Sequence, residues 1–420
     1  MSAYVIEGGR PLEGSVEVHG AKNSVLPILA ACLLAPGACV IQNCPRLSDV
    51  EASLAILRHL GCRAEWQGDG VVVDASAPSR WDVPDALMRE MRSSVIFLGA
   101  ILGRMGQARL CAPGGCELGP RPIDLHLAAI RALGGRVEDR EGGLSCSGQL
   151  RGADIVLSLP SVGATENAML AAVCAQGTTT ITNAAREPEI VDLQGFLQAL
   201  GARVRGAGSS VITVEGGAPL HGGAYRVMGD RIVAATYLAA AAAAGGDVEV
   251  AGVDWRTLST VTAVLKEAGC QVRSEADRIC LQSDGRLKGV RPIRTAPYPG
   301  FPTDAQAPLM AALATAAGTS VFVENIFESR YRHVDELARM GARIRVEGRV
   351  AVVFGVERLK AAAVRAADLR GGAALMVAAL GAEGESRITG VHHLDRGYAS
   401  LAEDLSALGA RVRREELTFS

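Results

Sequence analysis

One short pattern recurs six times along the 420 residues and restricts the folds that are open to this chain. Each copy places a glycine directly after a run with helical periodicity and directly before an extended segment. Because glycine readily adopts the left-handed conformation that ends many helices, the pattern predicts six helix ends, 67 to 73 residues apart. The copies are Leu60-Gly61-Cys62-Arg63, Leu133-Gly134-Gly135-Arg136, Leu200-Gly201-Ala202-Arg203, Ala268-Gly269-Cys270-Gln271, Met340-Gly341-Ala342-Arg343 and Leu408-Gly409-Ala410-Arg411.

Each pattern closes a larger repeat, which reads strand, helix, strand, helix and then one or two strands. The first and third repeats are the clearest pair, since GAKNSVLPILAACLL aligns with GATENAMLAAVCAQG. Six such repeats can form a ring or two groups of three, and periodicity leaves both open. In a group of three, each repeat can bury one helix against the others while the sheets face outward. We therefore expect an α/β protein whose two similar domains meet near Gly229.

Charge and hydropathy exclude several classes of protein. A formal net charge of −2 argues against a general nucleic-acid binder. The longest apolar run, Ile232 to Ala244, is shorter than the roughly 20 residues that span a bilayer, and the N-terminus lacks the pattern of a secretory signal. The ten cysteines contain no CxxC motif. We expect a reduced, cytoplasmic protein that binds neither nucleic acid nor membrane.

The leading helix of each repeat begins with polar or charged residues. Helix N-termini favour anions because their N–H groups lack partners, and lysine or arginine there adds full positive charge. A cap or a solvated surface charge explains any one of these residues alone, but recurrence favours a shared role. The residues are Lys22-Asn23, Arg92-Ser93, Thr165-Glu166, Asp230-Arg231, Thr303-Asp304 and Leu369-Arg370.

A loop between Leu110 and His126 carries a candidate reactive thiol. Its sequence, LCAPGGCELGPRPIDLH, is too rich in glycine and proline for a helix or a central strand. Cys116 lies on this loop with Arg121 close in sequence, and cationic surroundings poise a thiol for chemistry near neutral pH. Several of the other cysteines, such as Cys32 and Cys174, lie in apolar helical runs, and most of the ten are interpreted as buried structural residues.

These motifs resemble the UDP-N-acetylglucosamine 1-carboxyvinyltransferases, or enolpyruvyl-UDP-GlcNAc synthases, of peptidoglycan synthesis. The resemblance covers nearly the whole chain. It implies two inside-out α/β domains of three βαβαββ-type repeats each, with residues 22–229 in the first and residues 1–21 and 230–420 in the second. The motifs are GAKNSVLP, APGGCELGPRPIDLH, PSVGATEN, NAAREPEIVDL, PGFPTDAQ, ENIFESRYRHVDEL, ADLR and DRGY.

The resemblance also implies an activity: transfer of the enolpyruvyl group of phosphoenolpyruvate to the 3-hydroxyl of UDP-N-acetylglucosamine, with release of phosphate and without a metal or cofactor. It assigns to the phosphoenolpyruvate cavity the cations Lys22, Arg121, Arg330, Arg370 and Arg396. It assigns to the nucleotide sugar Asn23, Arg92, Arg121, Pro122, Ile123, Asp124, Leu125, Ser161, Val162, Gly163, Asp304 and Ile326. Cys116 matches the loop cysteine linked to protonation and to covalent inhibition by fosfomycin.

The reaction gives these residue types plausible roles. Addition to an enol phosphate needs a proton for the methylene carbon and a base for the attacking hydroxyl. Cys116 and Asp304 suit these tasks, with Lys22 as the third catalytic candidate, although Asp304 could instead be a simple helix cap. Arginines supply bidentate geometry for the substrate's phosphate and carboxylate.

Two alternatives remain. The sister enzyme that transfers enolpyruvyl to shikimate 3-phosphate shares the fold, but it lacks the PGGC loop and differs from AKN in its first helix. A catalytically silent sensor of nucleotide sugars is the second alternative, and the presence of Cys116, Asp304 and the cations argues against it.

Overall fold

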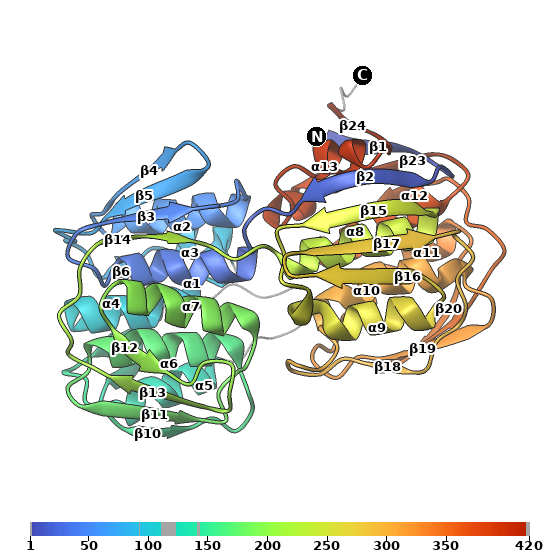
Figure 1. The fold of residues 1–420 in the computed structure, drawn as a ribbon. Coiled ribbons are helices and arrows are strands. Elements are labelled where there is room, and N and C mark those ends of the chain that lie inside the picture. Colours follow the sequence, from blue (N-terminus) through green and yellow to red (C-terminus); the bar gives the residue numbers. More distant parts are fainter. Residues whose placement is uncertain (1, 92, 111–122, 141–142, 417–420) are drawn as a thin grey trace. The chain divides into compact units, whose positions relative to one another are not determined.

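The computed structural model describes residues 2–91, 93–110, 123–140 and 143–416, and its ribbon is shown in Figure 1. The chain divides into two compact units. Unit 1 contains residues 2–19 and 229–416, whereas unit 2 contains residues 20–110 and 123–228.

The described strands form six four-stranded sheets, three in each unit. The sheets of unit 2 are β14-β3-β5-β4, β6-β7-β9-β8 and β10-β11-β13-β12, and those of unit 1 are β16-β17-β15-β2, β18-β19-β21-β20 and β22-β23-β1-β24. The strands of unit 2 are β3 (Ala38–Gln42), β4 (Arg63–Gln67), β5 (Gly70–Asp74), β6 (Asp82–Val83), β7 (Gln107–Leu110), β8 (Arg136–Arg140), β9 (Gly143–Ser147), β10 (Asp154–Val156), β11 (Thr178–Thr182), β12 (Arg203–Arg205), β13 (Val211–Glu215) and β14 (Gly223–Arg226). Those of unit 1 are β1 (Ser2–Gly8), β2 (Leu12–Glu17), β15 (Gly246–Ala251), β16 (Gln271–Glu275), β17 (Arg278–Ser283), β18 (Ile293–Arg294), β19 (Thr319–Val323), β20 (Arg343–Glu347), β21 (Val350–Phe354), β22 (Ala363–Arg365), β23 (Gly384–Thr389) and β24 (Arg411–Glu416).

The helices alternate with these strands along the chain. Those of unit 2 are α1 (Lys22–Cys32), α2 (Ser48–His59), α3 (Asp85–Glu90), η1 (Ser94–Ile96), α4 (Phe97–Met105), α5 (Asp124–Ala132), α6 (Val162–Cys174) and α7 (Pro188–Ala199). Those of unit 1 are α8 (Arg231–Ala244), η2 (Trp255–Leu258), α9 (Ser259–Glu267), α10 (Thr303–Ala312), η3 (Leu313–Thr315), α11 (Val334–Arg339), α12 (Leu369–Gly381), η4 (Val391–Arg396) and α13 (Leu401–Ala407).

The leading helix of each repeat is buried on every side. In α8 the sequence RIVAATYLAAAAAA has almost no polar face, and twelve of its residues are buried. A helix that is apolar all round is stable in water only inside a core. Accordingly, α8, α10 and α12 pack against one another in unit 1, and α4 packs against α1 and α6 in unit 2, with sheets outside them (Figure 1). The expected inside-out α/β architecture is confirmed.

Three strands complete sheets whose other strands lie far away in sequence. The N-terminal β1 lies between β23 and β24, with Tyr4 opposite both Ile388 and Arg414, and β2 runs parallel to β15. In unit 2, β14 returns to pair with β3. The first residues of the chain therefore belong to the same unit as the last described ones.

The six predicted helix ends are present. Each glycine has a φ angle between 82° and 108°, and each is the first residue after the C-cap of α2, α5, α7, α9, α11 or α13. The N–H of each glycine and that of the next residue donate back to carbonyls of the last turn, as Gly61 does to Arg58 and Cys62 does to Leu57. This pair of hydrogen bonds is the Schellman motif, which satisfies carbonyls that a helix end leaves unpaired.

We expect alanine at Gly61 to cost more stability than alanine at Gly134. Both glycines have positive φ angles, which cost an alanine about 1 kcal/mol. A Cβ at Gly61 would also lie 2.9 Å from the backbone nitrogen of Ser79, whereas at Gly134 the nearest atom is 3.7 Å away. This overlap adds roughly 1–3 kcal/mol. Urea denaturation of both variants measures the difference, and equal losses would contradict the prediction.

The prediction that Thr165-Glu166 lie at or near the first turn of their helix is confirmed. Helix α6 begins at Val162 with Ser161 as its N-cap, so Thr165 lies at the end of the first turn. The side chain of Ser161 accepts a hydrogen bond from the N–H of Ala164.

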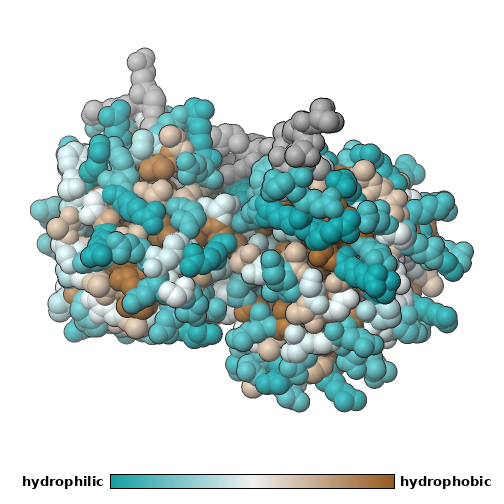
Figure 2. All heavy atoms as spheres, turned by 90° about the horizontal axis from the view of Figure 1, so that it is seen from above, coloured by the Kyte–Doolittle hydropathy of each residue, from teal (hydrophilic) through white to brown (hydrophobic). Residues whose placement is uncertain are grey.

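On the face shown in Figure 2, hydrophilic side chains are interspersed with residues of intermediate hydropathy and with smaller apolar patches. Among the described residues, no helix combines the length and apolar character needed to cross a membrane.

Candidate active site

The buried helices of unit 1 begin with differently capped N-termini. The carboxylate of Asp230 accepts hydrogen bonds from two N–H groups of α8, and Asp368 does the same for Arg370 and Gly371 in α12. The N-cap of α10 is Pro302, which offers no side-chain cap. Asp304 is the second residue of α10, so its carboxylate is not the N-cap that we considered as an alternative.

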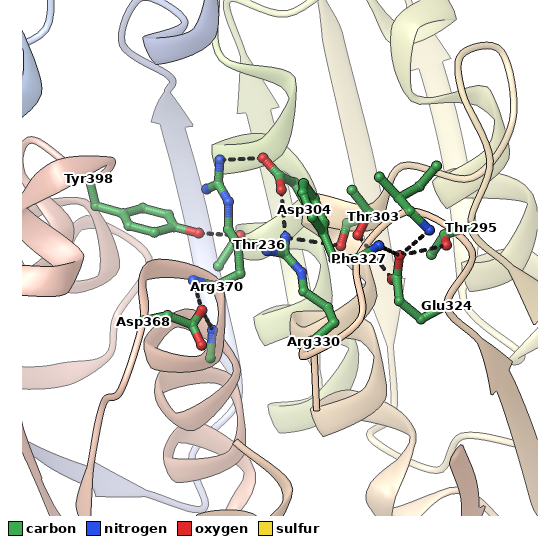
Figure 3. Close-up of polar contacts among 12 residues, drawn as sticks. Thr236, Thr295, Thr303, Asp304, Glu324, Phe327, Arg330, Asp368, Arg370 and Tyr398 are labelled. Atoms are coloured by element: carbon green, nitrogen blue, oxygen red, sulfur yellow. Dashed lines mark hydrogen bonds and ion pairs between the residues drawn. The ribbon is translucent and has the colours of Figure 1, made fainter. Parts of the chain in front are cut away.

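Asp304 instead bridges two buried arginines (Figure 3). Its Oδ1 lies 2.5 Å from Nη2 of Arg330, and its Oδ2 lies 2.9 Å from Nη2 of Arg370. The two arginine side chains are 4% and 5% exposed, whereas that of Asp304 is 25% exposed. Residues far apart in sequence thus form one compact charged cluster, with a carboxylate that solvent still reaches.

The cluster changes the acidity of Asp304. Burial acts to raise its pKa, but Arg370 and Arg330 more than offset this effect through charge and hydrogen bonds. The net result is a pKa held far below the usual range of an aspartate. In this state Asp304 is an ionised hydrogen-bond acceptor and a weak base.

Both arginines also carry a buried N–H group without a partner. Nε of Arg330 and Nη1 of Arg370 donate to no atom in the described part of the chain. Buried donors left unpaired cost free energy, and guanidinium donors bind carboxylate and phosphate oxygens well. The chemistry of these two groups thus suits them to binding an anion beside Asp304.

Two further predicted residues lie in unit 1. Ile326 is 38% exposed on the turn after β19, and its N–H donates to the buried carboxylate of Glu324. Arg396 is half-buried at the end of η4. Glu324 was not among the predicted residues.

In unit 2, α1 begins with a buried ion pair. Lys22 is the first residue of α1, and its Nζ lies 2.8 Å from Oδ2 of Asp49 in the first turn of α2. A cation at a helix N-terminus is unfavourable, and Asp49 compensates for it. Asn23, the next residue, is exposed. Lys22 and Asn23 are thus presented at one helix start, as predicted.

The start of α6 faces a histidine of α5. The N–H of Gly99 donates to Oδ1 of Asn167, so Nδ2 of Asn167 faces His126 and donates to its Nδ1 over 2.8 Å. Burial lowers the pKa of His126 to about 4, so the ring is neutral near pH 7 and carries its proton on Nε2. A Cβ at Gly163 would lie 2.9 Å from the His126 ring, so only glycine fits there.

The other predicted residues nearby follow from these helix starts. Ser161 and Val162 are half-buried at the beginning of α6. Ile123, Asp124 and Leu125 lie at the start of α5 and are half-buried, exposed and half-buried. Four predicted residues lie outside the described residues, namely Arg92, Cys116, Arg121 and Pro122.

Comparison with known proteins identifies the family. A family model described as EPSP synthase (3-phosphoshikimate 1-carboxyvinyltransferase) matches residues 6–405. A protein of Caldanaerobacter subterraneus subsp. tengcongensis named UDP-N-acetylglucosamine 1-carboxyvinyltransferase 2 is 50% identical over 415 residues, which are 99% of this chain and 100% of that protein. A Symbiobacterium thermophilum protein named UDP-N-acetylglucosamine 1-carboxyvinyltransferase 1 is 50% identical over 98% of this chain and 95% of its own.

The chain belongs to the UDP-N-acetylglucosamine 1-carboxyvinyltransferase family. Solved structures confirm the enolpyruvyl transferase fold expected for this family. The enolpyruvyl transferase NikO from Streptomyces tendae matches with a TM-score of 0.89 at 28% identity, over 98% of both chains. An EPSP synthase from Acinetobacter baumannii matches with a TM-score of 0.74 at 20% identity, over 99% of this chain and 100% of its own, and shares the fold.

Among the described residues, no group of histidine, cysteine and carboxylate side chains has the arrangement of a metal site. The charged groups that meet in unit 1 are a carboxylate and two guanidiniums, which are suited to binding anions and orienting a hydroxyl group.

Proposed function

We propose that this chain transfers the enolpyruvyl group of phosphoenolpyruvate to the 3-hydroxyl of UDP-N-acetylglucosamine, releasing phosphate in the first committed step of peptidoglycan synthesis. The observation that carries the proposal is the Asp304 cluster, in which two buried arginines present unpaired donors beside a solvent-accessible carboxylate. Membership of a family whose relatives are named for this reaction supports it. The proposed site of action is the cytoplasm.

The reaction has an addition step and an elimination step. In the addition, the sugar oxygen forms a bond to C2 of phosphoenolpyruvate while C3 gains a proton and the sugar hydroxyl loses one. In the elimination, C3 loses a proton and the C2–O bond to phosphate breaks. Arg330 and Arg370 would bind the carboxylate or phosphate oxygens of the substrate, and Asp304 would accept a hydrogen bond from the attacking hydroxyl.

The low pKa of Asp304 gives the substrate anion a role in this scheme. While both arginines pair with Asp304, the carboxylate attracts a proton weakly. An incoming anion that shares their charge raises the proton affinity of Asp304. The carboxylate would then become a useful base only when phosphoenolpyruvate is bound.

Phosphate release tests the proposal directly. The purified chain should release phosphate from phosphoenolpyruvate when UDP-N-acetylglucosamine is present. It should release none when shikimate 3-phosphate replaces the nucleotide sugar, and none from phosphoenolpyruvate without a second substrate. Release with shikimate 3-phosphate would favour the sister activity. Binding of UDP-N-acetylglucosamine without release under any condition would favour the sensor.

We predict that Cys116 reacts fastest with an epoxide mimic of phosphoenolpyruvate such as fosfomycin. The described cysteines are poor competitors, since none is fully exposed and burial raises the pKa of Cys44 to about 12 and that of Cys62 to about 11. Peptide mass spectrometry of the native chain locates the label. Cys116→Asp should keep a proton donor and lose the label, and faster labelling of another cysteine would refute the assignment.

A further inference from the structure

A buried carboxylate, Glu324, forms hydrogen bonds with two of the three segments that carry the charges of the Asp304 cluster, those of Asp304 and Arg330. Glu324 follows β19 directly and is 1% exposed. Its Oε1 accepts hydrogen bonds from the Thr295 hydroxyl and from the N–H groups of Ile326 and Phe327, at 2.8 to 3.0 Å. Its Oε2 accepts one from the Thr303 hydroxyl at 3.0 Å. Figure 3 shows these contacts converging on one side chain.

A carboxylate is the side chain that suits this position. All four partners act as donors, and a carboxylate offers about four acceptor sites and no donor. The oxygen of a glutamine could still accept the three hydrogen bonds made to Oε1, but its NH2 group would face the Thr303 hydroxyl, which would have to change from donor to acceptor. Glutamine would therefore alter the contact to Thr303 and remove the negative charge.

The first segment held by Glu324 is the start of α10. Thr303 is the first residue of this helix and Asp304 the second, and the N-cap, Pro302, has no side-chain donor or acceptor to fix the first turn. The hydrogen bond from Thr303 to Glu324 supplies that restraint. It fixes the backbone from which the Asp304 carboxylate projects.

The second segment is the turn that leads to Arg330. The N–H groups of Ile326 and Phe327 share Oε1 of Glu324, and the guanidinium carbon of Arg330 lies 5.2 Å from the centroid of the Phe327 ring. Arg330 also donates to the carbonyl of Thr303 at 3.3 Å. Asp304 and Arg330, whose side chains are 2.5 Å apart, therefore both follow backbone segments that are hydrogen-bonded to Glu324.

We infer that Glu324 is a positioning residue that sets the separation of Asp304 and Arg330 and acts on the reaction only through them. It makes no contact with substrate in this scheme. The inference rests on the proposed function for its kinetic measurements, whereas its structural measurement is independent of any activity.

A double-mutant cycle distinguishes positioning from a general effect on stability. Glu324→Gln should lower kcat/KM by about 10- to 100-fold, because small displacements of reacting groups have effects of that size. In a background of Asp304→Asn, the same substitution should cost less than about 3-fold, because the group that Glu324 positions has already been changed. If Glu324→Gln lowers kcat/KM by the same factor in the Asp304→Asn background as in the native chain, the inference is overturned.

Three further measurements complement the double-mutant cycle. Thr303→Val removes only the contact to Oε2 and should lower kcat/KM in the same direction but less, even if Glu324→Gln fails to fold. The control Glu336→Gln alters a partly buried glutamate of α11 that accepts a hydrogen bond from Arg365, and its kcat/KM should not change. A crystal structure of Glu324→Gln or Thr303→Val should show Asp304 and Arg330 farther apart than 2.5 Å.

The crystal structures of these variants also distinguish the positioning role of Glu324 from the proposed enzymatic function. An unchanged Asp304–Arg330 distance in both variants would overturn the positioning role, whatever reaction the enzyme catalyses. A lengthened distance in a chain that releases no phosphate would leave the positioning role standing and refute the proposed function.

Discussion

Asp304→Asn should abolish most turnover and destabilise unit 1. The substitution removes the negative charge between two arginines that are almost completely buried, so their positive charges face each other uncompensated. Removing one partner of a buried ion pair costs about 3 kcal/mol, and the partial exposure of Asp304 places the cost at the lower end of the usual range. Asparagine can still accept a hydrogen bond from the sugar hydroxyl but cannot act as a base, so kcat should fall by about 100-fold or more.

Urea denaturation and phosphate release measure these two effects separately. Asp335→Asn is the matched control, since Asp335 is an exposed aspartate in the first turn of α11 and its charge contributes only about 0.3–1 kcal/mol. Near-normal turnover of Asp304→Asn would show that Asp304 only balances charge.

The ion pairs of Asp304 with Arg330 and Arg370 should persist in acid. Because the pKa of Asp304 is lower in the folded chain than in the unfolded chain, where it is about 4, the ion pairs contribute their full stability at any pH above 4. This stability is lost only as the pH falls through the much lower pKa of the folded state.

Acid should destabilise both units through two buried histidines. Burial lowers the pKa of His126 in unit 2 and of His333 in unit 1 to about 4. Above pH 6.5 the ring is neutral in both the folded and the unfolded chain, so stability is unaffected. Between about pH 6.5 and 4 only the unfolded chain binds the proton, so the free energy of unfolding falls as the pH falls. The full loss is about 3 kcal/mol for each histidine.

The histidine effect is measured as a difference between variants. Other buried groups titrate in the same range, and burial raises the pKa of Glu166 in unit 2, which stabilises the fold as the pH falls. Urea denaturation between pH 7 and 4.5 should therefore compare the native chain with His126→Gln. The variant should have a shallower pH dependence, whereas His221→Gln, at an exposed position, should not. Parallel curves for the native chain and His126→Gln would contradict the prediction.

The sequence predicted the parts of the fold that depend on local chemistry. A glycine after a helical run needs no distant partner to end the helix, and all six glycines do so. The buried helices were predictable for a similar reason, since their apolar sequences leave no face for water. Thr165-Glu166 were predicted at or near the first turn of α6, and Thr165 lies at the end of that turn.

The polar groups behind the site could not be predicted in the same way. Glu324 collects donors from positions 295, 303, 326 and 327, and Asn167 joins Gly99 to His126, so their roles exist only once the chain has folded. Asp304 was identified by resemblance, but its pairing with both Arg330 and Arg370 required the structure. Polar residues inside a buried helix, such as Thr165, Glu166 and Asn167 in α6, were an available signal.

The pairing of β1 with β23 and β24 has a consequence for synthesis of the chain on the ribosome. Every described strand of unit 2 lies between Ala38 and Arg226, so its sheets can form once that stretch has emerged. In unit 1, β2 waits for β15 (Gly246–Ala251), whereas β1 waits for β23 and then for β24 (Arg411–Glu416). Strand β1 ends at Gly8 and β24 begins at Arg411, so at about 5–20 residues per second this delay lasts about 20 to 80 s. The residues of β1 thus leave the ribosome first but are among the last to form their sheet hydrogen bonds. During that interval β1 is an apolar strand without its neighbours β23 and β24.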